Sequence, residues 1–128
     1  MTIMTPILDT DYVRFELEDD LLIATYKKGK KITLEVAQQI VRDRMEFTEG
    51  RTVLVLLQNQ GVISFDKAAR DYLASREGTS GIKAAAILSD TPATAMIGNF
   101  LIRVNRPHMP ARLFTNKERA IGWLRTKS

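Results

Sequence analysis

Four charged side chains in the stretch "GVISFDKAARD" (residues 61–71) are of the types that transfer protons or bind ions: Asp66, Lys67, Arg70 and Asp71. The stretch follows an apolar run, and the loop after a parallel strand is a frequent place for a functional site. An Asp at a helix start also accepts free backbone N–H groups, and charges four residues apart form exposed pairs worth a few tenths of a kcal/mol. We therefore interpret this cluster as a helix cap followed by solvated charges, rather than as an acid–base site.

No other nucleophile or metal ligand group stands out. The chain has no cysteine and a single histidine, His108, in the proline-containing segment "RPHMP". Thiolate chemistry, Cys-based metal sites and His clusters are thereby excluded, and we expect His108 on a surface loop. The chain also lacks G-x-G-x-x-G and G-x-x-x-x-G-K-[ST] phosphate loops. We predict no catalytic residue, no metal and no cofactor, so the chain is not expected to be an enzyme.

The composition is that of a globular protein with one core. The chain has 128 residues, of which 45% are hydrophobic and 27% charged, and its net charge is +4. Basic residues gather at "KKGKK" (27–31) and near the C-terminus, but few aromatic residues accompany them, so nucleic-acid binding is not predicted. The N-terminus does not resemble a signal peptide, and no apolar run approaches the roughly 20 residues of a membrane span. We expect a cytoplasmic protein.

Apolar periodicity predicts strands and helices that alternate after an opening hairpin. Residues 12–19 and 21–28 alternate apolar and polar side chains, which is typical of half-buried strands. The runs "TVLVLL" and "IKAAAILS" are continuous, which is typical of strands covered on both faces. The predicted order is β-β-α-β-α-β-α-β-α, with strands at 12–19, 21–28, 52–57, 82–89 and 111–114, and helices that begin after the caps Thr33, Asp66, Thr91 and Thr115. This order predicts a mixed, mainly parallel sheet of about five strands packed with about four helices.

The third predicted helix carries the clearest apolar stripe in the chain. The stripe has helical spacing and is most simply explained as core packing. The alternative is that part of it, with Ile63 and Phe65, forms an apolar surface or pocket for a lipid-like ligand or a second subunit. The stripe consists of Ala93, Met96, Ile97, Phe100, Leu101 and Val104.

The element order, the strand "AAAILSD", the segment "IGNFLIRVNRPHMPARLF" and the ending "TNKERAIGWL" together resemble the SpoIIAA-like group of the STAS superfamily, also called STAS/SEC14-like. The superfamily name stands for sulphate transporter and anti-sigma factor antagonist. The resemblance covers roughly residues 11–126, and it implies a SpoIIAA-like α/β fold. We accordingly divide the chain into an N-terminal extension (1–10) and one STAS-like domain (11–128).

The anti-sigma factor antagonists of this superfamily carry a phosphorylatable serine after the central strand. Gly61, Val62 and Asp66 match that motif, but Lys67 and Ala68 occupy the two serine positions. The phosphorylation switch is therefore not carried over, and Ser64 lies outside the motif.

Two functions remain open for this scaffold. The first is a non-enzymatic regulatory module that binds a protein partner or a second copy of itself. The second is a carrier of a small apolar or anionic ligand. For partner binding we expect the exposed loops after the central strands to form the contact edge, and for a carrier we expect the apolar side chains of "VISF" and the third helix to contribute. The candidate binding residues are Ser64, Phe65, Asp66, Lys67, Ser89, Asp90 and Thr91.

Overall fold

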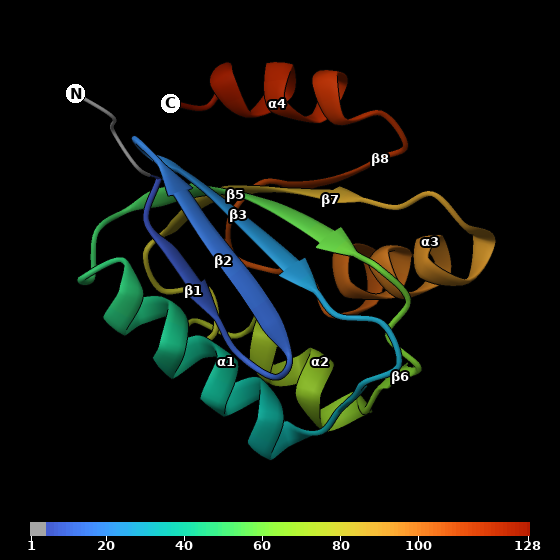
Figure 1. The fold of residues 1–128 in the computed structure, drawn as a ribbon. Coiled ribbons are helices and arrows are strands. Elements are labelled where there is room, and N and C mark those ends of the chain that lie inside the picture. The colour runs from blue at the N-terminus through green and yellow to red at the C-terminus, as the bar shows by residue number, and fades with distance from the viewer. Residues whose placement is uncertain (1–4) are drawn as a thin grey trace.

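A six-stranded sheet forms the centre of the protein, in a computed structural model that describes residues 5–128 (Figure 1). Its spatial order is β1-β2-β3-β5-β7-β8. The first three strands pair antiparallel, and β3, β5, β7 and β8 pair parallel. The predicted mixed, mainly parallel sheet is thus confirmed. The strands are β1 (Ile7–Asp9), β2 (Val13–Glu18), β3 (Leu21–Tyr26), β5 (Val53–Asn59), β7 (Ile82–Leu88) and β8 (Ala111–Phe114).

The helices cover the sheet unequally. Helices α1, α2 and α3 lie on one face, and α4 alone lies on the other (Figure 1). Each parallel strand is added on the same side of the previous one, so right-handed crossovers bring the three connecting helices to the same face. Helix α3 continues directly into a π-helix, η1. The bounds are α1 (Leu34–Phe47), α2 (Lys67–Ala74), α3 (Pro92–Asn99), η1 (Phe100–Val104) and α4 (Lys117–Arg125).

Two strand pairs were not predicted. Residues 7–9, which we assigned to an N-terminal extension, form the edge strand β1 and pair with β2. The rest of that extension includes residues 1–4, which lie outside the described residues. Strands β4 (Lys31–Ile32) and β6 (Ser64–Phe65) form a separate two-stranded parallel sheet. These strands have two or three residues, which is too short for a period-two pattern to be recognised.

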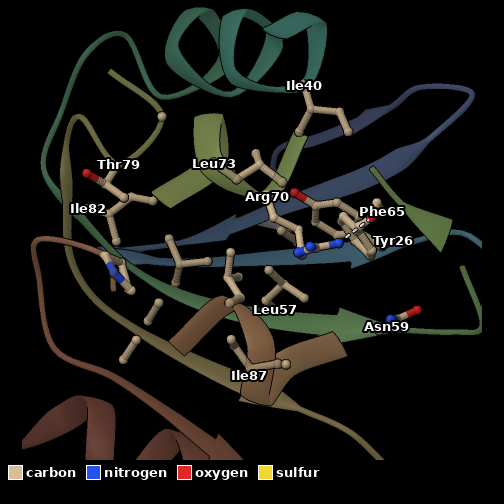
Figure 2. A pocket seen from close by; sticks show the side chains of 18 of the residues that line it. Tyr26, Ile40, Leu57, Asn59, Phe65, Arg70, Leu73, Thr79, Ile82 and Ile87 are labelled. Carbon is tan, nitrogen blue, oxygen red and sulfur yellow. Dashed lines mark hydrogen bonds between the residues drawn. The ribbon is translucent and has the colours of Figure 1, made fainter. Parts of the chain in front are cut away.

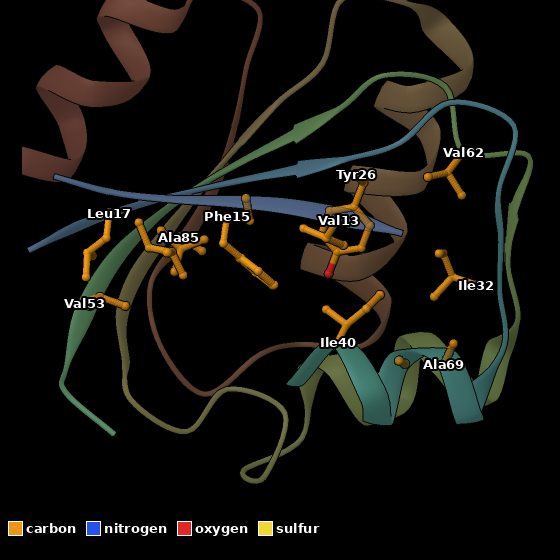
Figure 3. Close-up of a cluster of buried hydrophobic side chains, with 14 residues drawn as sticks. Val13, Phe15, Leu17, Tyr26, Ile32, Ile40, Val53, Val62, Ala69 and Ala85 are labelled. Carbon is orange, nitrogen blue, oxygen red and sulfur yellow. The ribbon is translucent and has the colours of Figure 1, made fainter. Parts of the chain in front are cut away.

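A hydrophobic core lies on each face of the sheet. The larger core fills the space between the sheet and the three helices, and it includes Phe15, Tyr26 and Ile40 (Figure 3). The smaller core lies under α4, where Ala84 and Ala86 of β7 meet Leu124. Small alanines allow a helix to approach a sheet closely, so α4 packs tightly against its face.

The helix starts match the predicted caps at two of four sites. The hydroxyl of Thr33 accepts from Val36 N, and Thr91 forms a reciprocal capping box with Thr94. Asp66 stands at the N-cap position of α2 but makes no side-chain cap hydrogen bond, so the predicted carboxylate cap is wrong. Helix α4 begins one residue later than predicted, because Asn116 instead of Thr115 accepts from the N–H of Arg119. Asn is among the strongest N-cap residues, which explains the shift.

Candidate functional site

A cavity of about 80 Å³ lies between the main sheet and helices α1, α2 and α3–η1 (Figure 2). Strands of the sheet form one wall and the three helices form the other. Most of the lining is aliphatic, which makes the cavity a place for apolar groups. Representative lining residues are Ile40, Leu57, Leu73, Ile87, Ile97 and Leu101.

The apolar stripe of the third helix divides between this cavity and the surface. Ile97 and Leu101 line the cavity. Met96, Phe100 and Val104 are 59%, 43% and 63% exposed. The interpretation of the whole stripe as core is therefore correct only in part. The helix changes to π geometry at Phe100, and single π turns inside helices are frequent at functional sites.

Arg70 brings a cation into the apolar cavity from α2. Its Nη1 donates to the backbone carbonyl of Phe65 at 2.7 Å, and its guanidinium carbon lies 5.4 Å from the centre of the Phe100 ring. Its Nε is buried and has no hydrogen-bond partner. We had placed Arg70 among exposed charges, but it is half-buried. A buried N–H without an acceptor costs roughly 1 to 3 kcal/mol, so it needs an explanation.

Arg44 on α1 is a second lining cation and is almost fully buried. Its Nη1 donates to the carbonyl of Ser80 at 2.7 Å, and its Nη2 donates to that of Gly78 at 3.0 Å. Burial lowers the pKa of Arg44, because no carboxylate compensates its desolvation. Arg44 thus ties α1 to the loop before β7 through two hydrogen bonds.

Tyr26 of β3 also lines the cavity, and its hydroxyl points into the space between the sheet and α1 (Figure 3). Desolvation raises the pKa of Tyr26 from 10.0 to about 12, although the charge of Arg44 opposes the shift. The Tyr26 ring lies 5.7 Å from the ring of Phe65. Tyr26 therefore provides a neutral hydroxyl, and its ring forms an aromatic pair with Phe65.

The charges of the cavity are one-sided. Its lining includes Arg44 and Arg70 but no Asp or Glu. Within residues 5–128, the ion pairs join Arg14 to Glu16, Lys27 to Asp9, Lys67 to Asp71 and Arg125 to Asp20, and neither lining arginine takes part in one. Two positive charges therefore face an apolar space without an internal counterion, and this space favours a negative charge.

The first predicted binding stretch contributes to the cavity through one residue. Phe65 lines it, and Ser64 precedes Phe65 in β6 and is half-buried. Asp66 and Lys67 are exposed, and Lys67 pairs with Asp71 at 2.7 Å. In this stretch the side chain of Phe65 therefore lies in the cavity wall, whereas those at the start of α2 are exposed to solvent.

The second predicted stretch lies at the start of α3. We expected Ser89 in an exposed loop, but it is buried and its hydroxyl bonds to that of Thr94. The hydroxyls of Thr91 and Thr94 also share a hydrogen bond of 2.8 Å, and Thr94 itself lines the cavity. Asp90 is exposed and borders a separate polar depression, with Lys28 and Lys117 among its lining residues. The two stretches thus meet at the cavity through Phe65 and Thr94, rather than as one exposed edge.

Sequence reasoning missed Arg44 and Tyr26. A signal for Arg44 was present, because it follows Ala37, Ile40 and Val41 on the apolar face of its helix. A charged residue at such a position is rarely buried without a specific partner. Tyr26 carried no such signal, since a tyrosine on an alternating strand is ordinary.

The arrangement of strands and helices defines a SpoIIAA-like fold. A solved structure with this fold is similar along nearly the whole chain: an uncharacterised protein of the DUF3478 family from Shewanella loihica PV-4. The two chains share 15% identity with a TM-score of 0.61, and the match covers 97% of this chain and 98% of the other. The predicted resemblance is confirmed at the level of the fold.

This chain belongs to the family described as "Domain of unknown function (DUF7793)", whose model matches residues 15–128. No curated protein matches the chain. Among the helices of residues 5–128, none is both long enough and apolar enough to cross a membrane.

Proposed function

We propose that this protein is a non-enzymatic binding module that carries a small apolar ligand in the cavity between its sheet and helices α1, α2 and α3–η1. The observation that carries this proposal is the cavity itself, about 80 Å³ in volume and lined mainly by aliphatic side chains. Its two arginines support binding rather than catalysis, because a guanidinium neither accepts protons nor attacks as a nucleophile near neutral pH.

The size of the cavity limits the ligand. An apolar cavity of about 150 Å³ binds benzene, and drug-sized ligands occupy roughly 300 Å³ or more. About 80 Å³ therefore accepts only a few carbon atoms before side chains must move. Leu101 lines the cavity and the exposed Phe100 precedes it in the π-helix η1. We therefore expect the side chains of η1 to move when a larger ligand binds.

Native mass spectrometry of freshly purified protein tests the proposal directly. We expect a bound small molecule, released by mild activation. Calorimetric titration with 1-hexanol tests whether an apolar ligand binds in this cavity. Ala85 lines the cavity, so Ala85→Leu adds three carbon atoms to its wall and should abolish hexanol binding.

The matched control is Ala93→Leu, which makes the same change at an exposed position of α3. It should leave hexanol binding within about twofold of the wild type. A clean apo mass together with no hexanol binding would refute the carrier proposal.

A second candidate function is self-association or binding of a regulatory partner, and the exposed side chains of Met96, Phe100 and Val104 favour it. They are spaced four residues apart on α3 and η1, so they project from one side of that segment. Light scattering after size exclusion measures the homodimer. A monomer at every accessible concentration would eliminate it.

A further inference from the structure

Resting on the proposed ligand-binding function, we propose that the ligand is a small apolar carboxylic acid, bound as its carboxylate by the guanidinium of Arg70. The aliphatic part of such a molecule matches the aliphatic lining of the cavity, which includes Leu57 and Ile87 (Figure 2). Its charged end supplies an acceptor for the unpartnered Nε of Arg70 and the negative charge that the cavity lining lacks.

One edge of the Arg70 guanidinium carries a buried Nε without a hydrogen-bond partner, and a ligand reaches this edge once neighbouring side chains move. Nη1 is held by the carbonyl of Phe65 at 2.7 Å. Nε lies on the other edge, and it is the atom without a partner. In arginine, Nε and Nη2 present two parallel N–H bonds that match the two oxygens of a carboxylate. The bond to Phe65 fixes the orientation of the plane, so little rotational freedom is lost when an acid binds.

The neighbours of Arg70 strengthen this pairing. Phe100 stacks on the guanidinium, with 5.4 Å between the guanidinium carbon and the ring centre, and shields it from water on that side. Asp71, the next residue along α2, is engaged by Lys67 and by the side-chain amide of Asn105 instead. In a partly dehydrated site an ion pair is less screened than on the surface.

Arg44 contributes charge, and both of its terminal nitrogens are already engaged. Its two terminal nitrogens already donate to carbonyls of Ser80 and Gly78. It therefore adds to the positive potential of the cavity, while Arg70 makes the direct contact. Arg70 is also the less buried of the two.

The test compares two probes that differ only at the polar end, hexanoate and 1-hexanol, by calorimetry at neutral pH and low salt. We expect the wild type to bind hexanoate at least tenfold more tightly than 1-hexanol. Arg70→Gln should weaken hexanoate binding by roughly ten- to a hundredfold, which is the range for a hydrogen-bonded charge. Its affinity for 1-hexanol should stay within about twofold, which also shows that the variant is folded.

Two further variants complete the test. Arg70→Lys keeps the charge without the planar pair of donors, so it should recover only part of the hexanoate affinity. Arg76→Gln makes the same charge change at an exposed position near the end of α2, and it should leave both affinities unchanged.

The outcomes separate the two proposals. Equal affinity of the wild type for the two probes, or an equal loss of both in Arg70→Gln, would overturn the role of Arg70 and leave the apolar carrier standing. If neither probe binds, the carrier proposal fails and the carboxylic acid proposal fails with it.

Discussion

The two faces of the sheet are packed in different ways. Under α4, Ala84 and Ala86 of β7 and Leu124 of the helix are completely buried. On the opposite face three helices share a wider surface, and the space between them and the sheet contains a cavity with Arg44, Arg70 and Tyr26 in its lining.

The difference has a geometric cause. One helix can settle into the shallow surface made by small residues, and the contact is then continuous. Helices α1, α2 and α3 reach the sheet from separate crossovers, and α3 turns into a π-helix on the way to β8. The α4 face therefore provides stability through close packing, whereas the three-helix face gives up some packing and gains a site.

The largest expected effect is on stability, and it differs between the two faces. Leu124→Ala should reduce the free energy of unfolding by roughly 3 to 5 kcal/mol, because Leu124 is fully buried and closely surrounded. Leu73→Ala should cost only about 1 to 2 kcal/mol, because Leu73 is half-buried and already borders the cavity. Urea denaturation of both variants measures the contrast. Equal losses would mean that the two faces are packed alike.

The second effect is a loss of stability at high pH, which we assign to the cavity face. The pKa of Tyr26 is about 12 in the fold and 10.0 ordinarily, so above pH 10 the unfolded chain loses this proton before the folded protein does. The stabilisation is complete below pH 10 and is lost as the pH rises to 12, by about 3 kcal/mol. The free energy of unfolding, measured by urea titration from pH 9 to 12, should fall accordingly.

The control for this pH effect is Tyr26→Phe, which should reduce the fall. A smaller fall should remain, because the pKa of Tyr72 is also raised by burial. An unchanged profile in Tyr26→Phe would show that another group causes the loss.

The smallest effect concerns the helix starts on the two faces. Asn116→Ala should cost about 1 kcal/mol, because the Asn116 side chain accepts from the N–H of Arg119 at the start of α4. Asp66→Ala should change the stability by less than about 0.5 kcal/mol, since its carboxylate makes no cap bond at α2. Thermal unfolding of the two variants would contradict this if Asp66→Ala were the more destabilised.

Much of the fold could be predicted from local patterns. The apolar run in 52–57 and the alanine-rich run in 82–89 specify strands covered on both faces, and these are β5 and β7. Thr33 and Thr91 marked two helix starts correctly, because a hydroxyl and the next turn of backbone suffice to make the bond. Local chemistry was less reliable at the other two starts: Asp66 makes no cap bond at α2, and Asn116 replaces Thr115 as the cap of α4.

The candidate site was much less predictable. Phe65 was predicted for binding and does line the cavity. Ser89 was predicted in an exposed loop, but it is buried and its hydroxyl bonds to that of Thr94. The unpartnered Nε of Arg70 depends on Phe65 at one side and Phe100 at the other, and these residues are 35 positions apart. No spacing within one helix reveals such a contact.

By itself, the sequence determined the order of strands and helices and the mainly parallel sheet, because periodicity and caps are properties of neighbouring residues. The SpoIIAA-like fold was implied by the resemblance of its motifs to that group. Only the tertiary structure decided which face is tightly packed, where the cavity lies and which arginines enter it. The burial of Arg44 and Arg70, and the lack of a carboxylate beside them, depend on side chains that distant segments bring together. A one-dimensional pattern does not contain that information.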